Sequence, residues 1–155
     1  MGATLKHKEG TGGKSLKRVL DKYRNSVQGK SVVAGLVKGK SSAENIEKGY
    51  KNEFGGLSSG MREIPARPFM AQSVPFVKEA IQTMPEKFDV SNPKEYLNAV
   101  GKNMADAIVM SIDSQDFTPN AEFTRLHKSF AYGHEKILVE TGSMRSDMKH
   151  EIRKA

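Results

Sequence analysis

Apolar residues recur at helical spacing in three stretches of the chain, and each stretch predicts an amphipathic helix. In residues 15–27 they follow an i, i+3, i+4 rhythm, while lysine and arginine occupy the other faces. In residues 93–113 a broader stripe predicts the longest helix, with Asn92 as its N-cap and Pro93 at its first position. The third stripe, over residues 69–84, predicts one further helix.

The segment of residues 41–54 also favours a helix, although a short strand is an alternative. Its large apolar residues recur every four positions, at Ile46, Tyr50 and Phe54. Ser41 and Glu44 have the spacing of a capping box, in which each side chain bonds a backbone N–H of the first helical turn. Gly55 stands where a helix commonly ends.

The remaining patterns predict short strands that lie far apart in the sequence. Residues 31–38 are rich in β-branched and apolar side chains, residues 137–139 form a short apolar run, and residues 147–153 alternate weakly. The polar stretch 114–133 contains one expected helical turn, at residues 121–128. Because helices outnumber strands, the expected fold class is α+β, with a small, mainly antiparallel sheet packed against two or three helices.

A glycine-rich loop leads into an extended, proline-containing arm near the middle of the chain. Glycine gives the loop (residues 55–60) a free backbone, whereas proline stiffens the arm (residues 64–68) and extends the residue before it. Arg62 and Arg67 are expected to project from this stretch, and Phe69 follows as an apolar anchor. The pattern favours an element that grips a partner, and an ordinary loop with a stiff exit is the alternative.

Basic residues are concentrated at one end of the 155-residue chain, whose net charge is +7. Residues 1–40 hold ten lysines and arginines against two acidic residues, giving +8, and residues 41–155 hold fifteen against sixteen, giving −1. Such a segment can meet nucleic acid, an acidic protein surface or only solvent. Residues 1–13 lack periodicity and are expected to be a flexible basic segment, followed by a single α+β domain over residues 14–155.

Patterns typical of catalysis or ligand binding are missing from the sequence. The chain has no cysteine, its four histidines share no metal-ligand spacing, and residues 10–15 lack the spacing of a phosphate-binding loop. No apolar run approaches the roughly 20 residues that cross a bilayer. We therefore expect a binding or assembly protein with no enzymatic activity, no cofactor, no metal and no membrane partner.

Four segments in a fixed order resemble a known family. Residues 52–56 read Asn-Glu-Phe-Gly-Gly, and residues 64–70 read Ile-Pro-Ala-Arg-Pro-Phe-Met. Thr118-Pro119-Asn120 precedes Thr124, and residues 134–145 end in Ile-Leu-Val-Glu-Thr-Gly-Ser-Met-Arg. Over about residues 31–152 the chain is similar to the virion-morphogenesis and tail-completion (neck, head–tail joining) proteins of tailed bacteriophages. It departs modestly from their pattern, with Glu140 where aspartate is commoner and Met144 where leucine is commoner.

The resemblance implies a structural protein rather than an enzyme. Such a subunit forms a homo-oligomeric ring, here expected to contain six or twelve copies, around the DNA channel of the neck. Its partners are the head-connector or portal-side protein and the tail-tube or tail-terminator protein. Its location is the virion, and the host cytoplasm during assembly. The alternative function is a basic DNA-binding accessory protein.

Two groups of residues are the candidate contacts of such a subunit. The expected contacts with a neighbouring subunit or partner are Arg62, Ile64, Pro65, Arg67, Pro68, Phe69, Thr141 and Arg145. The expected contacts with DNA in the channel or with an acidic partner are Lys6, Lys8, Lys14, Lys17 and Arg18. Thr141 and Arg145 are alternatively residues that only shape a turn. If Arg67 and Phe69 make the contact, replacing both by alanine damages head–tail joining more than folding.

Overall fold

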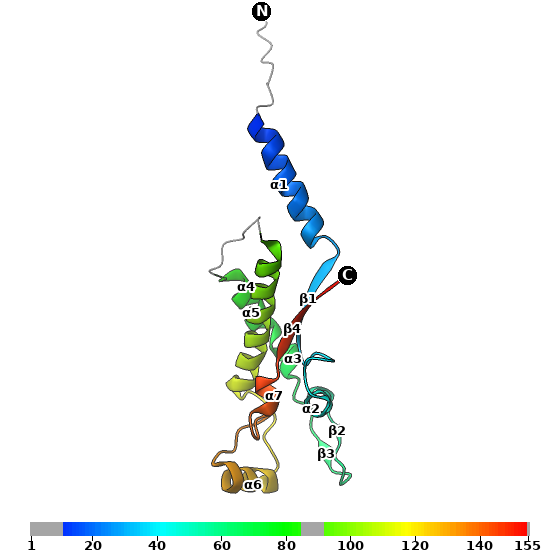
Figure 1. Ribbon diagram of the computed structural model, residues 1–155. Helices are drawn as coiled ribbons and strands as arrows, with labels where there is room; N and C mark the ends of the chain where they lie inside the picture. Colours follow the sequence, from blue (N-terminus) through cyan, green and yellow to red (C-terminus); the bar gives the residue numbers. More distant parts are fainter. Residues whose placement is uncertain (1–10, 85–91, 155) are drawn as a thin grey trace, which may run out of the picture.

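The computed structural model describes residues 11–84 and 92–154, which form an elongated α+β molecule (Figure 1). The elements in chain order are α1 (Thr11–Val27), β1 (Lys30–Gly35), α2 (Ala43–Phe54), β2 (Gly56–Leu57), β3 (Glu63–Ile64), α3 (Phe69–Gln72), α4 (Val74–Gln82), α5 (Pro93–Ser114), α6 (Glu122–Tyr132), α7 (Ser143–Ser146) and β4 (Lys149–Lys154). Within the described residues the strands form two separate antiparallel pairs, β1 with β4 and β2 with β3. The α+β class is thus confirmed, with its sheet split in two.

Helix α5 is the centre of the fold, because α3, α4 and the β1–β4 pair all pack against it (Figure 1). Strand β1 pairs with β4 from Lys30 opposite Lys154 to Gly35 opposite Lys149. This pairing joins a strand near the start of the described chain to the strand at its end. The buried core cluster consists of Phe69, Ala105, Ile108, Ile112, Met144 and Met148. Three of these six residues lie on α5, which explains why the longest apolar stripe of the sequence became the central helix.

Gly101 lets β4 approach α5 closely, and replacing it with alanine is expected to destabilise the protein. A Cβ atom there would lie 2.5 Å from Cδ2 and 2.9 Å from Cβ of His150, at the root of a side chain on β4. Alanine gains about 1 kcal/mol of helix propensity, but overpacking of a fixed contact costs about 1–3 kcal/mol. We expect Gly101→Ala to lower the free energy of unfolding in urea by about 1 kcal/mol, whereas the exposed Lys102→Ala changes little. A variant more stable than the natural chain would contradict the close packing.

Most of the elements expected from periodicity are present. The helices expected over residues 15–27, 41–54 and 93–113 correspond to α1, α2 and α5, so the strand alternative for the second is wrong. The capping residue of α2 is Ser42, which accepts from Asn45 N at 3.1 Å, so the expected Ser41–Glu44 box is wrong by one position.

The strand expected over residues 137–139 is wrong. Leu138 has a φ of 60°, and Ile137 N donates at 2.5 Å to Oε1 of Gln115 instead of to another strand. Leu138 and Val139 pack on the core, which accounts for the apolar run without a sheet. Their side chains satisfy the same pattern that a buried strand would show.

Two expected helices have different extents. The helix expected over residues 69–84 is divided into α3 and α4, because Ser73 ends α3 and Pro75 can stand only in the first turn of a new helix. The single turn expected at residues 121–128 is the full helix α6. None of the helices in the described ranges is long and apolar enough to cross a membrane.

Candidate functional site

The glycine-rich loop is a β-hairpin rather than a free loop. Gly56 pairs with Ile64 and Leu57 with Glu63, and Ser58 N donates to the Arg62 carbonyl at 2.9 Å across the turn. The hairpin continues directly into the arm. The glycine-rich loop, whose backbone was expected to be free, is therefore held by backbone hydrogen bonds. Its tip stands at the end of the molecule opposite α1 (Figure 1).

The arm is fastened to the end of α2 by the residues of the Asn-Glu-Phe-Gly motif. Arg67 N donates to the Asn52 carbonyl at 2.6 Å. The Glu53 carboxylate accepts from Met70 N at 2.9 Å and from Ala71 N at 3.1 Å, so it caps the first turn of α3. Gly55 has a φ of +76°, and a Cβ there would lie 3.0 Å from the Ile64 carbonyl oxygen. These contacts explain why that motif and the arm belong together.

Arg67 is turned into the protein. Its side chain is only 7% exposed, and it donates from Nε to the Thr118 carbonyl at 2.8 Å and from Nη2 to the Pro119 carbonyl at 3.2 Å. Burial lowers the pKa of Arg67 from its ordinary value, but an arginine remains charged. The expectation that Arg67 reaches an acidic group of a partner is therefore corrected, because its donors bind two carbonyl groups of its own chain.

Phe69 is likewise committed to the fold. It is 1% exposed and belongs to the core cluster, and its carbonyl accepts a hydrogen bond at 3.0 Å from the buried Ser111 hydroxyl on α5. A side chain in this position cannot contact a neighbouring subunit, so the expected interface role of Phe69 is also corrected. The neighbouring Pro68 is half-buried.

Lys128 on α6 is a second buried cation near Arg67. Its Nζ donates to the Lys136 carbonyl at 2.9 Å and to the Val139 carbonyl at 2.8 Å. Burial lowers the pKa of Lys128; the negative charge of Glu140 opposes this, and the positive charge of Arg67 adds to it. The two cations thus act as braces that hold the segments around residues 118–119 and 136–139.

A cavity of about 390 Å³ lies between these braced segments. Helix α2 contributes Lys48 and Asn52, and α6 contributes Thr124 and Lys128. The arm lines it with Ile64, Pro65 and Arg67, the loop before α6 with Asn120, and the C-terminal turn with Thr141 and Ser143. All four segments that carry the resemblance therefore meet around one cavity, although they are spread over almost a hundred residues of sequence.

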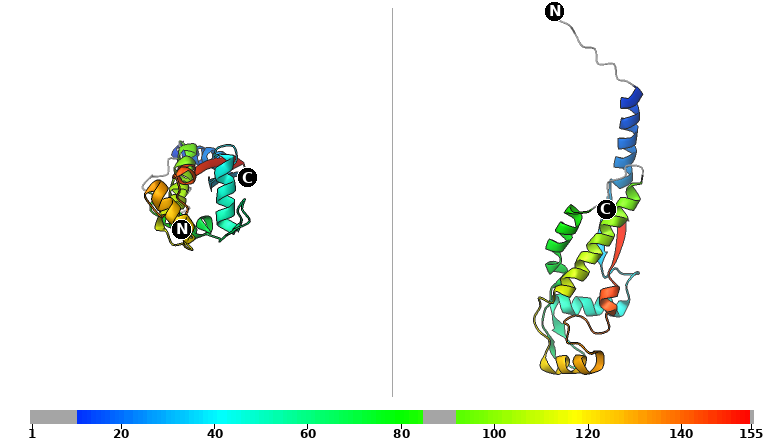
Figure 2. Two further views of the ribbon diagram at one scale, coloured as in Figure 1. Left: turned by 90° about the horizontal axis from the view of Figure 1, so that it is seen from below. Right: turned by 90° about the vertical axis from the view of Figure 1, so that its left-hand side faces the viewer.

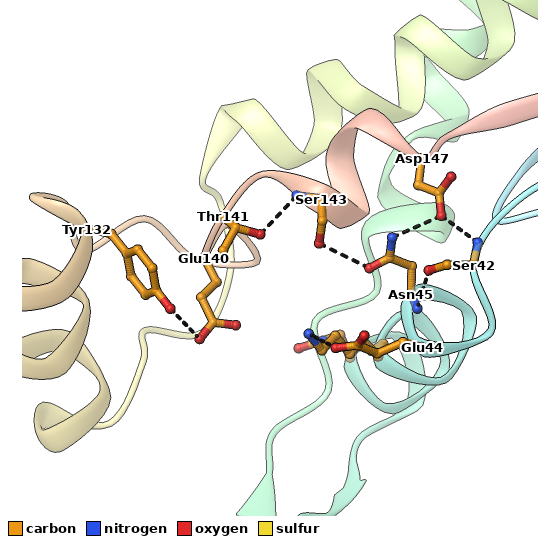
Figure 3. A network of polar contacts seen from close by, with 10 residues as sticks. Ser42, Glu44, Asn45, Tyr132, Glu140, Thr141, Ser143 and Asp147 are labelled. Carbon is orange, nitrogen blue, oxygen red and sulfur yellow. Dashed lines mark hydrogen bonds and ion pairs between the residues drawn. The ribbon is translucent and has the colours of Figure 1, made fainter.

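The C-terminal turn is fastened to the start of α2 by a polar network (Figure 3). Oδ2 of Asp147 accepts from Ser42 N at 2.7 Å and from Nδ2 of Asn45 at 2.9 Å. The Ser143 hydroxyl donates to Oδ1 of Asn45 at 3.2 Å. Figure 3 shows Asp147 pointing at the first turn of α2, where a carboxylate also benefits from the helix dipole.

We expect Asp147→Asn to lower the free energy of unfolding by about 1 kcal/mol at neutral pH. The pKa of Asp147 lies below its ordinary value, mainly because the Asn45 amide, and then Ser42 N–H, donates to the charged form. The stabilisation is complete above the unfolded value of about 3.9 and is lost as the pH falls through the lowered folded value. Urea unfolding at pH 7 and in acid should show the difference shrinking, with the exposed Asp116→Asn as the control. A difference that does not change with pH would contradict the assignment.

Thr141 and Arg145 lie on the surface beside the cavity. The Thr141 hydroxyl accepts from Ser143 N at 3.4 Å, which shapes the entry to α7. Arg145 forms a two-pronged ion pair with Asp113 of α5, with Nε 2.8 Å from Oδ1. Since both side chains remain 45% exposed, the pair ties the turn to α5 without being buried. Arg62 and Pro65 are exposed, and Ile64 is half-buried.

Large apolar side chains gather on two exposed faces beside the cavity. The α6 face is defined by Phe123, Leu126 and Phe130. The hairpin face is defined by Tyr50, Phe54, Leu57 and Met61. The rings of Tyr50 and Phe54 lie 5.0 Å apart, so they form one apolar surface along α2. The sequence prediction missed the α6 face, although its i, i+3, i+7 spacing was visible.

The basic residues of the N-terminal quarter are only partly within the described structure. Lys17 and Arg18 are exposed on α1, which extends away from the rest of the molecule (Figures 1 and 2). Lys14 lies in the first part of α1. Lys6 and Lys8 lie outside the described residues, as does most of the expected flexible segment.

Comparison with known proteins did not extend this picture: no family model, no curated protein and no solved structure matches the chain.

Proposed function

We propose that this protein is a non-catalytic structural subunit of a tailed-phage neck. In this role, copies of the chain form a ring around the DNA channel, between the head connector and the tail tube or tail terminator. The protein would act in the virion and, during assembly, in the host cytoplasm.

One observation carries the proposal: the described chain exposes more large apolar side chains than it buries. Among the residues whose exposure the structure describes, thirteen large hydrophobic residues are exposed, whereas six large hydrophobic residues and two alanines are buried. Single exposed apolar residues are ordinary on a soluble protein, but contiguous patches mark surfaces that contact other proteins. Phe123, Leu126 and Phe130 recur at helical spacing on α6, and the rings of Tyr50 and Phe54 lie 5.0 Å apart in the hairpin face. Such groupings suit the molecule to assembly with other proteins.

The braced cavity supports the same proposal. The four segments of the phage-neck resemblance supply Asn52, Glu53, Arg67 and Ser143 or their binding partners to the contacts described above. Those contacts hold α2, α6 and the hairpin in fixed relative positions. A subunit that transmits load between two rings needs such a rigid frame beneath its contact surfaces.

The test is the oligomeric state of the purified chain together with its binding to isolated neck components. Light scattering and negative-stain imaging should show rings, formed either alone or on the addition of isolated connector or tail tube. A chain that stays monomeric and binds neither component would overturn the proposal.

A second function, DNA binding, is favoured by α1. Lys17, Arg18, Lys22 and Arg24 are all exposed on this helix, which projects from the body (Figure 2). If these four residues each neutralise one phosphate, the logarithm of the DNA association constant should fall with the logarithm of salt concentration with a slope of about −3.6. A neck subunit without this function should bind duplex DNA weakly at physiological salt.

A further inference from the structure

The two helices on either side of the cavity turn their polar sides inward and their apolar sides outward. On α6, Thr124 and Lys128 line the cavity. Leu126 and Phe130 each stand two positions from Lys128, which is a rotation of about 200° around an α-helix, so they face away from the cavity. On α2, Lys48 lines the cavity and Tyr50 lies the same rotation away from it. This is the reverse of a helix that buries its apolar face in its own core.

The α6 face and the hairpin face contain the most exposed apolar side chains of the described residues. Phe130 is 96% exposed and Met61 84%, and the other five members of the two faces are between 57% and 72% exposed. Every large hydrophobic residue outside the two faces whose exposure the structure describes is less exposed than these seven. The exposure is thus concentrated on two surfaces rather than spread over the molecule.

The elements that carry the two faces stand on opposite sides of one end of the molecule. In Figure 1, α6 stands on the left of the lower end, and α2 and the β2–β3 hairpin stand on the right. The view from below in Figure 2 also separates α6 from α2. Two different surfaces on opposite sides are what a head-to-tail contact requires, and repetition of that contact closes a ring or extends a filament.

We infer that the occupant of the hairpin face is the α6 face of a second copy of this chain. This inference rests on the proposed function and identifies the subunit contact within it. The contact is heterologous: each copy offers α6 to one neighbour and the hairpin to the other.

The shapes of the two faces fit this contact. Beside the hairpin there is an open hollow of about 550 Å³ lined by Phe54, Leu57, Ile64, Pro65 and Ala66. Phe130 projects almost completely from α6, so its ring can enter this hollow as a knob. Ile64 and Pro65 line the hollow on one side of the arm and the cavity on the other. The exposed part of the arm thus contacts the neighbour, while Arg67 and Phe69 hold it in place.

The apolar area of the two faces is what a stable contact between copies needs. With about 200 Å² for each large side chain, the α6 face offers roughly 460 Å² and the hairpin face roughly 550 Å² of apolar surface at the observed exposures. A standard interface buries about 1,600 Å² in total, a little more than half of it apolar. The two faces together therefore supply the apolar part of one standard interface.

Cross-linking between single-cysteine variants tests the contact directly, because the natural chain contains no cysteine. We expect Leu126→Cys, which keeps the Phe130 knob, mixed with Leu57→Cys to give a covalent dimer under mild oxidation, while neither variant alone does so. The double variant should give a ladder of covalent oligomers. Met110→Cys, exposed on α5 outside both faces, is the matched control and should give no dimer with either variant.

Loss of the knob gives an independent readout. Phe130→Ser should weaken association at least tenfold without changing the melting temperature, whereas Met110→Ser should leave association unchanged. Covalent dimers of Leu126→Cys alone would overturn the head-to-tail contact in favour of a symmetric one. Oligomers or connector binding without the mixed cross-link would overturn this inference and leave the proposed function standing. A monomer that binds no neck component would overturn both.

Discussion

Replacing Phe69 by alanine is expected to lower the free energy of unfolding by about 3–5 kcal/mol. The Phe69 ring is 1% exposed among Ile108, Ile112 and the other members of the core cluster, and few buried hydrophobic side chains are present to compensate for the cavity. Because a domain of this size is stabilised by only about 5–15 kcal/mol, the variant should be largely unfolded at modest urea concentrations.

Phe54 is the matched control. It directly precedes the glycine-rich loop, as Phe69 directly follows the arm, and it is 68% exposed. Phe54→Ala should change the free energy of unfolding by about 0.5 kcal/mol or less, while weakening association through the hairpin face. Urea unfolding followed by circular dichroism measures the free energy of unfolding of both variants. Equal destabilisation of the two variants would contradict the assignment of one ring to the core and the other to the surface. The prediction also reverses the expectation that replacing Arg67 and Phe69 together by alanine harms head–tail joining more than folding.

Replacing Arg67 by methionine is expected to cost about 2–4 kcal/mol of stability, since two part-buried hydrogen bonds from a charged donor are lost. The accepting carbonyls belong to Thr118 and Pro119, which precede α6, so amide hydrogen exchange should accelerate at Thr118 and in α6 more than in α5. The pKa of Lys128 should rise in the variant, because the positive charge of Arg67 helps to lower it.

The control for Arg67→Met is Arg62→Met, because Arg62 is exposed at the end of the hairpin turn. It should leave stability within about 0.5 kcal/mol. Arg67→Lys should recover only part of the loss, because one ammonium group cannot reproduce the planar fork that reaches two adjacent carbonyls. Unchanged exchange in α6 of Arg67→Met would show that the arginine does not brace that helix.

The sequence was most informative where one element satisfies its own pattern. The stripe of residues 93–113 is wide enough to need a core on one side, and it became α5 with Asn92 and Pro93 at its start. The pairing partner of β1 could not be read from either strand, because the alternation of residues 147–153 specifies a face and not a neighbour. The apolar run of residues 137–139 was misread because burial, rather than strand pairing, selects its side chains.

The sequence indicated which segments make up the candidate site, but it did not indicate what each side chain does there. The four segments of the phage-neck resemblance were recognised as belonging together, and the structure brings all four to one cavity. Arginine beside proline suits an exposed grip and a buried brace equally well, and only the position of Thr118 and Pro119 decides between them. The α6 face was overlooked because a helical apolar stripe is ordinarily assigned to the core.

The sequence by itself therefore determined the local features of the protein. These are the α+β class, the main helices, the extended proline-containing arm and the basic first quarter. Periodicity, proline geometry and net charge depend on neighbouring residues and can be read directly. Only the tertiary structure decided which side chains point into the core and which point to the surface. Phe69 is buried in the core, whereas Phe54 and Phe130 are exposed, because burial depends on which distant segments fill the space beside each residue. Here a cavity lined by polar side chains such as Lys48 and Lys128 lies on the inner sides of α2 and α6, and their apolar sides face outward.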